Sequence, residues 1–485
     1  MKKLLTVLIY SMPFLLFGQA QEATLLGTWS RDDLVGSSFY NNTYNEIWGL
    51  SNGNQEYAVI GSTAGTHFID VTDPSQPEEV YFVAGAAQGG QVVHRDYHNY
   101  GCYLYAVCDE GNSTMQIMDI SSLPDSVSVV YDSDELIKRS HNIFIDTVRA
   151  RLYTFALFGG PQFNSAMRVY DITDPVDPKF EGEFNNFGGL DAGHVHDGYV
   201  HDGIGFMNCG NDGMAMVDFR NPTNPVTLGI MQNYPFAGYN HSGWPTTDMQ
   251  YYYLGDENWG YDIKVVDITE PENLITVNTF NAEANDNLNL SIPHNQIVAC
   301  NYLYSSYYYD GLQIYDISDP VNPQRVLYYD TSLLPHDNNY EGAWGVYPFL
   351  PSGNILISDM QEGLFVIQGP GDVCSDREES IVSCLSSTTA VNDPSIVSEL
   401  HIYPNPTNGV LNININLIES QSNVKVELVD LTGRSLTRLS TDNSYIAAGG
   451  TQLTFDIPDA IQAGFYLLRI SGDNWQRTEK VVIEE

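Results

Sequence analysis

A short phrase that recurs seven times constrains this chain more than any other feature of its sequence. The phrase is an apolar strand that ends in Asp and is often followed by a proline turn, as in residues 169–175 and 314–320. The marker positions of the copies are Asp70, Asp119, Asp171, Asp218, Asp267, Asp316 and, in a degenerate copy, Gln368. Successive markers lie 47 to 52 residues apart, which is too long for a helical-pair or leucine-rich repeat and fits a four-stranded propeller blade. The repeats therefore predict an all-β chain that contains a seven-bladed β-propeller.

The amino-terminal end of the repeats is predicted to close the ring of blades. Residues 24–29 resemble the fourth strand of other units, such as residues 226–230, but no first three strands precede them. We expect this strand to complete the last unit, which ends at Ile367, so that no sheet edge stays open. The Asp and Pro residues of the phrase are interpreted as turn formers, because the ligand spacing and the Gly of an EF-type calcium loop are absent.

The charge of the chain excludes one class of partner. Asp and Glu number 61, Lys and Arg number 20, and the formal net charge is −41. A protein this acidic repels phosphate backbones and anionic lipids. We therefore expect no nucleic acid partner.

Residues 1–20 have the pattern of a secretory signal peptide. Lys2 and Lys3 precede an apolar run over residues 4–17, and residues 18–20 supply the small side chains of a cleavage site. The alternative is a membrane anchor, but the run is shorter than the roughly 20 residues that a spanning helix needs. No other stretch is long and apolar enough, so the sequence predicts a soluble, exported chain without a transmembrane segment.

The six cysteines predict at most one disulfide. Cys102 and Cys108 lie on one strand-like run, about 20 Å apart at the rise of a β-strand, which is beyond disulfide reach. Cys374 and Cys384 are ten residues apart in a polar connector. We expect Cys374 and Cys384 to pair and most of the other cysteines to be packing residues.

A second unit follows the repeats. Residues 371–398 have the composition of a linker, and residues 399–485 contain short alternating strands. Three features of this unit occur in a fixed order, namely Tyr403-Pro404-Asn405-Pro406, the turn at residues 430–433, and a basic residue, Lys480, before the last strand. In these features it resembles the carboxyl-terminal sorting domain of type IX secretion, a small β-sandwich. The alternative is an ordinary immunoglobulin-like sandwich used for adhesion.

The sorting-domain resemblance implies a route out of the cell. A signal peptide would carry the chain across the inner membrane, and the type IX secretion machinery would carry it across the outer membrane for release or attachment at the cell surface. The repeats, over residues 22–370, resemble the exported LVIVD-repeat propellers of the choice-of-anchor B group. That resemblance implies a fold and an exported location, and little chemistry. We expect residues 22–370 to fold without the carboxyl-terminal unit.

Histidine recurs near the start of the first strand in five of the seven units. The five are His98, His141, His196, His241 and His294, and the first and last units carry Trp48 and Trp344 instead. Because the first strand of a blade lines the central channel, we expect the five imidazoles to converge at one height, on the face that carries acidic loops such as Asp109-Glu110. His94, His194 and His336 lie in the preceding loops and could add to this face.

Converging imidazoles suit zinc, copper, iron or nickel, so a transition metal at the hub is one hypothesis. The alternative is that the rings bond to carbonyl groups or channel water and make the hub rigid. The loops of the same face also carry aromatic residues, such as Trp259 and Tyr308, which would suit a polar ligand such as a sugar.

The function predicted from these features is a binding or interaction module at the cell surface, with an unknown protein or glycan as its ligand. A hub metalloprotein or metalloenzyme is the first alternative, and a structural surface component is the second. The sequence contains no Gly-x-Ser-x-Gly, His-Glu-x-x-His, phosphate-binding glycine loop or Cys-x-x-Cys motif. It therefore does not decide whether the protein is an enzyme.

Overall fold

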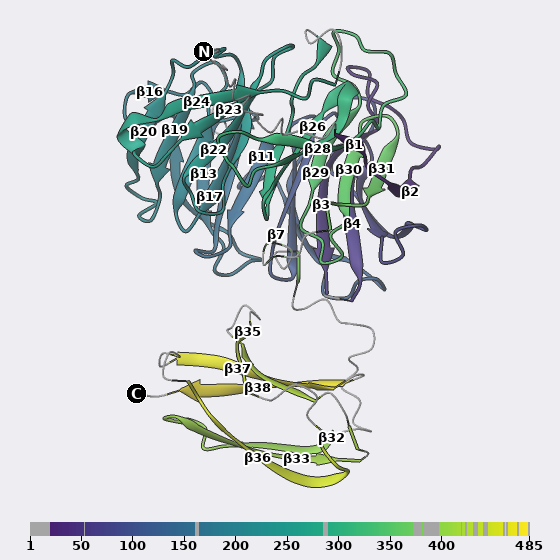
Figure 1. The fold of residues 1–485 in the computed structure, drawn as a ribbon, viewed down its shortest axis with the longest axis vertical. Coiled ribbons are helices and arrows are strands. Elements are labelled where there is room, and N and C mark those ends of the chain that lie inside the picture. The colour runs from purple at the N-terminus through teal and green to yellow at the C-terminus, as the bar shows by residue number, and fades with distance from the viewer. Residues whose placement is uncertain are drawn as a thin grey trace, which may run out of the picture.

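The computed structural model describes residues 20–52, 54–160, 164–284, 290–371, 374, 376, 380–382 and 397–483, the last range with gaps at 419, 422–423, 430–434, 440–444, 459–460, 462–463 and 473–474. The described residues are almost entirely β-strands and turns (Figure 1). Helices are limited to short 3-10 turns such as η1 (Pro271–Asn273) and η3 (Tyr308–Asp310). In the described part of the chain, no helix has the length and hydropathy needed to cross a membrane.

Seven sheets, each with four consecutive repeat strands or their equivalent, form the propeller. Blade 1 contains β3 (Tyr44–Ser51), β4 (Glu56–Ser62), β5 (Gly65–Asp70) and β6 (Glu78–Ala84). Blade 2 contains β7 (Arg95–Tyr100), β8 (Tyr103–Cys108), β9 (Met115–Asp119) and β10 (Ser128–Ser133). Blade 3 contains β11 (Arg139–Asp146), β12 (Arg151–Phe158), β13 (Ser165–Asp171) and β14 (Lys179–Phe184), and a small hairpin of β15 (Asn186–Phe187) and β16 (Leu190–Asp191) follows it.

The next blades repeat this order. Blade 4 contains β17 (Asp197–His201), β18 (Ile204–Asn208), β19 (Met214–Asp218) and β20 (Val226–Met231). Blade 5 contains β21 (Asn240–Pro245), β22 (Tyr251–Asp256), β23 (Ile263–Asp267) and β24 (Ile275–Phe280). Blade 6 contains β25 (Gln296–Ala299), β26 (Tyr302–Tyr307), β27 (Gly311–Asp316) and β28 (Gln324–Tyr329), and β1 (Gln21–Glu22) adds to its outer edge in parallel.

The amino-terminal strand closes the ring, as predicted. Blade 7 contains β29 (Ala343–Tyr347), β30 (Ile355–Asp359) and β31 (Gly363–Ile367), and its fourth strand is β2 (Leu25–Trp29). The pairing of β2 with β31 is antiparallel, from Leu25 opposite Ile367 to Trp29 opposite Leu364 (Figure 1). The first strands of neighbouring blades contact one another in sequence from β3 to β29, and β29 contacts β3.

The Asp that ends each phrase is a turn residue. In the first blade, Oδ1 of Asp70 accepts a hydrogen bond of 2.8 Å from the backbone N–H of Thr72. The same contact, to the N–H two residues further on, recurs at Asp119, Asp171, Asp218, Asp267 and Asp316, with lengths of 2.7 to 3.0 Å. This Asx turn ends the third strand in blades 1 to 6 and explains the repeated Asp without a metal.

The predicted disulfide between Cys374 and Cys384 is wrong. Cys374 is bonded to Cys300, with a Cα–Cα distance of 5.8 Å, and Cys384 lies outside the described residues. Cys102, expected to be a packing residue, is also disulfide-bonded, whereas Cys108 and Cys209 are buried free thiols. The connector was interpreted as a free linker, but its described residues lie against the propeller, so proximity in sequence did not decide the pairing.

We call residues 374, 376 and 380–382 the strap. The backbone N–H of Cys300 donates to Asp376 Oδ2 at 2.7 Å. Ser51 forms a parallel bridge with Ile381, in which its N–H donates to the carbonyl of Ser380 and its carbonyl accepts the N–H of Val382, both at 2.7 Å. Val382 is 2% exposed and belongs to the core cluster of Leu50 and Tyr57. Ser51 ends β3 and Cys300 follows β25. The strap therefore lies at the far ends of the first strands, away from their starting ends.

The carboxyl-terminal strands form two packed sheets, as expected for a β-sandwich. One sheet contains β32 (Val397–Tyr403), β33 (Val410–Leu417) and β36 (Gly449–Asp456). The other contains β34 (Lys425–Val429), β35 (Ser435–Arg438), β37 (Gly464–Gly472) and β38 (Trp475–Ile483). Buried side chains of both sheets, such as Ile413 and Leu468, share one core. The predicted turn at residues 430–433 lies outside the described residues.

Candidate functional site

The starting ends of the first strands surround a cavity of about 410 Å³ at the mouth of the central channel. Its lining is polar and aromatic, and consists of Tyr40, His94, His141, His196, Asn211, Tyr239, His241, Glu257, Asn258, His294, Tyr308, Tyr340 and Trp344. Four of the five predicted histidines are among these residues. The fifth lining histidine is His94, which precedes β7.

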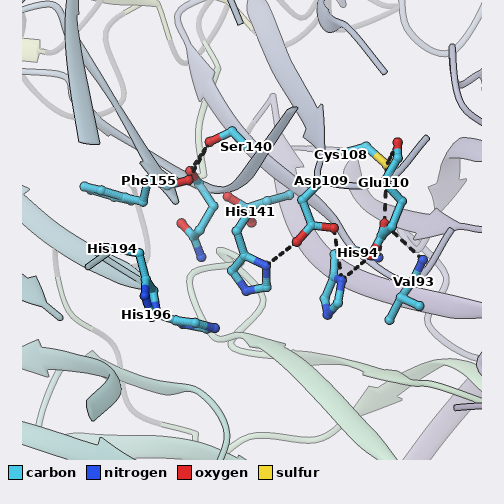
Figure 2. Close-up of polar contacts among 12 residues, drawn as sticks. Val93, His94, Cys108, Asp109, Glu110, Ser140, His141, Phe155, His194 and His196 are labelled. Carbon is cyan, nitrogen blue, oxygen red and sulfur yellow. Dashed lines mark hydrogen bonds and ion pairs between the residues drawn. The ribbon is translucent and has the colours of Figure 1, made fainter. Parts of the chain in front are cut away.

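Five histidines and one tryptophan form a closed circuit of ring contacts. Successive ring centroids are 4.7 Å apart from His94 to His141, then 4.2 Å to His196, 4.1 Å to His241 and 4.5 Å to His294. Trp344 closes the circuit, 4.8 Å from His294 and 5.2 Å from His94. We call His94, His141, His196, His241 and His294 the histidine ring; Figure 2 shows three of its members with the acidic loop of blade 2.

The predicted position of His98 is wrong, because it lies one layer deeper in the channel. His98 pairs with Tyr105 in blade 2, and Phe144 pairs with Tyr153 in blade 3. His98 and Phe144 therefore occupy equivalent positions in their blades. The His98 ring contacts Trp48 at 4.3 Å and Phe144 at 4.9 Å. His94, which the sequence placed in a loop, occupies the blade 2 position of the ring instead.

The deeper layer closes the channel with a second aromatic circuit. Contacts of 4.3 to 6.0 Å run through Trp48, His98, Phe144, Trp244, Phe349 and Tyr347 and back to Trp48, with Tyr199 packed against Phe144 and Trp244. Trp48 therefore belongs to this deeper layer, whereas Trp344 lies at the height of the histidine ring, as expected.

Irregular pairing of the first strands redirects two residues of the circuit, His241 and Trp344. In β21 the ladder shifts between Asn240 and Ser242, so His241 is the extra residue of a bulge. A bulge of the same kind in β29 lies between Ala343 and Val346 and includes Trp344. Bulges leave one residue unpaired and redirect its side chain, and they are common beside functional sites. They also allow two consecutive positions to face the channel.

The second inward position carries buried carboxyl groups beneath the ring. Glu46, Asp96 and Asn295 line the small space beneath the ring from blades 1, 2 and 6, and Asp197 directly follows His196 in blade 4. Burial raises the pKa of Glu46 and of Asp197 to about 7, and burial together with the charge of Glu46 raises that of Asp96. Glu46 Oε2 accepts a hydrogen bond of 3.2 Å from the Asn295 amide.

The loop after β8 brings two carboxylates to one side of the ring, as the sequence predicted (Figure 2). Asp109 contacts Nδ1 of both His141, at 2.7 Å, and His94, at 3.2 Å. Glu110 Oε1 is 2.5 Å from the same nitrogen of His94, and its other oxygen accepts the backbone N–H of His94. Although burial lowers the pKa of His94, the two carboxylates outweigh it and raise the pKa to about 10.

The other side of the ring carries Glu257, which follows β22. Glu257 Oε2 is 3.9 Å from Nε2 of His241, and Tyr308 donates its hydroxyl to Oε1 at 2.6 Å. Burial raises the pKa of Glu257 to about 7. Sequence reasoning placed this residue among many acidic loop residues, and nothing in its local pattern distinguished it from them.

Two of the buried imidazoles bond to main-chain carbonyl groups. Nδ1 of His196 lies 3.3 Å from the carbonyl oxygen of His241, and Nδ1 of His294 lies 2.7 Å from that of Trp344. Nδ1 of His241 is buried without a hydrogen-bond partner. Burial lowers the pKa of His196 and His241 far below the usual range and that of His294 to about 3, so these three rings are neutral at physiological pH.

The remaining two histidines named from the sequence differ in position. His194 lies at the rim, with Nε2 2.6 Å from the hydroxyl of Tyr239. His336 bonds to Asp310 Oδ1 at 2.7 Å and does not line the cavity. Among the described residues, potential metal-binding groups at the hub are His94 with Asp109 and His141, and His241 with Glu257 and His294. A third group contains Cys300 and Cys374, whose sulfurs are joined in the disulfide.

Two family models match parts of the chain. One, described as an LVIVD repeat, matches residues 297–331. The other, described as a secretion system C-terminal sorting domain, matches residues 401–484. Both matches agree with the resemblances found in the sequence, and the sorting domain indicates a protein that is secreted or displayed at the cell surface by type IX secretion.

Comparison with solved structures supports the fold. The chain is similar to the WD40 repeats of RRP9, with 9% sequence identity and a TM-score of 0.50, over 72% of this chain and 99% of that one. A second similar structure is the β-propeller domain of Myceliophteria thermophila Cps50 (Swd1), with 11% identity and a TM-score of 0.46, over 71% and 98% of the two chains. At these identities the likeness to RRP9 shows the β-propeller fold alone. The comparison with curated proteins finds no match.

Proposed function

We propose that this protein is an exported β-propeller that binds a transition-metal ion in its histidine ring, at the mouth of the central channel. The observation that carries the proposal is the continuous run of five imidazoles around one cavity, with neighbouring ring centroids 4.1 to 4.7 Å apart. Imidazole nitrogens are common ligands of zinc, copper, iron and nickel.

The environment of the rings supports metal binding over a purely rigid hub. A metal ligand must be a neutral imidazole that keeps a free ring nitrogen, and its other nitrogen is usually held by a carbonyl or carboxylate oxygen. His196 and His294 meet this description through their Nδ1 contacts with carbonyl oxygens. In both rings Nε2 takes no part in the carbonyl contact, which makes it the candidate ligand atom.

Metal analysis of the natively exported protein, without an affinity tag, tests the proposal. We expect at least one equivalent of a transition metal per chain, and its loss in the His196→Ala/His241→Ala variant with the fold unchanged. His336→Ala is the matched control, because His336 lies outside the ring and should not affect metal content. Protein that stays metal-free after incubation with zinc, copper, nickel and iron salts would refute the proposal.

A second candidate function is glycan binding at the same mouth. Tyr40, Tyr239, Tyr340 and Trp344 line the cavity, and aromatic faces stack on sugar rings. A titration of oligosaccharides monitored by tryptophan fluorescence tests it. Saturable quenching in the wild type that is lost in Trp344→Ala supports this candidate, and the absence of any saturable signal rejects it.

A further inference from the structure

The histidine ring contains two separate ligand sets, and we propose that it holds two metal ions, one in each set. The first set is His94, His141 and Asp109, and the second is His241, His294 and Glu257. In each set, one ligand atom from every residue lies within 4.8 Å of the others. The inference rests on the proposed function and specifies how many ions the ring binds and through which residues.

The two sets repeat one design on two pairs of blades. His94 and Asp109 come from blade 2 and His141 from blade 3, whereas His241 and Glu257 come from blade 5 and His294 from blade 6. In both sets the carboxylate directly follows the second strand, since Asp109 follows β8, which ends at Cys108, and Glu257 follows β22, which ends at Asp256. A pair of neighbouring blades therefore supplies two histidines and one carboxylate in each set.

The distances in the first set are close to those that an ion requires. At metal–ligand bond lengths of about 2.0–2.2 Å, two ligand atoms of a tetrahedral ion lie roughly 3.3 Å apart. Asp109 is 2.7 Å from Nδ1 of His141 and 3.2 Å from Nδ1 of His94. Protons hold these atoms together in the metal-free protein, and an ion would replace those protons after small side-chain shifts.

The carboxylate of the second set lies farther from an imidazole nitrogen than Asp109 does in the first set, but fewer contacts hold it in place. Glu257 Oε2 is 3.9 Å from Nε2 of His241, and only its other oxygen is held, by the hydroxyl of Tyr308. The nitrogen of His241 that faces the carboxylate is Nε2, and its distance to Glu257 Oε2 is longer than the spacing of two ligand atoms on one ion. A cation bound between Nε2 of His241 and Oε2 of Glu257 would draw these two atoms together.

His196 lies between the two sets, with its ring 4.2 Å from that of His141 and 4.1 Å from that of His241. Two histidines and one carboxylate leave at least one coordination position open on each ion. Both sets border the cavity at the mouth. The open positions would therefore accept water or an oxygen donor of a ligand that enters this cavity.

Metal titration of the full-length, untagged protein tests the number of ions. After removal of metal with a chelator, Co(II) and Zn(II) are titrated and followed by visible absorption and by calorimetry. We expect two equivalents for the wild type, one for Asp109→Asn, one for Glu257→Gln, and none for the combined variant. These substitutions keep side-chain size, and circular dichroism confirms that each variant is folded. His336→Ala should keep two equivalents.

The outcomes separate this inference from the proposed function. One equivalent in the wild type overturns the two-ion inference and leaves the proposed function in place. No bound metal overturns both. Two equivalents that persist in both single variants overturn the assignment of Asp109 and Glu257 as ligands.

Discussion

Removal of the disulfide between Cys300 and Cys374 should destabilise the propeller by an amount that its position in the chain predicts. The bond spans 74 residues, and the loop-closure entropy that such a link removes from the unfolded chain is worth about 4 kcal/mol at 25 °C. The double variant Cys300→Ser/Cys374→Ser is preferable to a reducing agent, because Cys102 is in a disulfide as well.

Urea unfolding monitored by tryptophan fluorescence measures this effect, since five of the six tryptophans precede residue 367. With an unchanged slope, the free energy of unfolding should fall by about 2–5 kcal/mol. Cys209→Ser is the control for loss of a buried thiol, because Cys209 is free. A decrease below about 1 kcal/mol would refute the reasoning, and would mean that the strap stays in place without its covalent bond.

Three further predictions concern other parts of the molecule. Lys264→Met should lower the free energy of unfolding in urea by about 3–5 kcal/mol, because Lys264 and Asp256 are a fully buried ion pair and Asp256 would keep an unpaired charge. The double variant Lys264→Met/Asp256→Leu should recover most of that loss, and additive losses would contradict the explanation. Glu46 has a folded-state pKa of about 7, above its unfolded value of 4.5, so its ionisation destabilises the fold as pH rises through 7. Glu46→Gln should therefore raise the stability against thermal unfolding at pH 8, by up to about 3 kcal/mol, and have little effect at pH 5. An equal effect at both pH values would contradict the assignment. Truncation after residue 396, which keeps all six cysteines, should leave the propeller as stable as in the full chain and hold the protein in the periplasm. Truncation after residue 370 should also lose the stability due to the strap. Surface delivery of either truncated form, detected by cell fractionation, would contradict the role of the sorting domain.

Repetition explains why the fold could be predicted from the sequence. Each copy of the phrase carries a strand, and six of the seven copies carry an Asx turn, so the spacing of the copies reports the length of a blade directly. Residues 24–29 could be assigned to the last blade because they match one strand of a known unit. Signals of this kind are local, and seven copies reinforce one another.

The errors at the site arise from strand register and from contacts distant in sequence. Aligning short phrases by their histidine placed His98 with the ring, but the ladder pairs it with Tyr105 and puts it one layer deeper. The bulge at His241 depends on how two strands pair, and no local pattern marks it. The partner of Cys374 lies 74 residues away. Within the polar connector, the apolar pair Ile381-Val382 was a signal of docking.

The position of the strap determines how the propeller would face its surroundings. The histidine ring lies at the starting ends of the first strands, whereas Ser51 and Cys300, which hold the strap, lie at their far ends. The chain thus leaves the propeller on the face opposite the cavity. A ligand that enters the cavity therefore does not have to pass the strap or the disulfide that holds it.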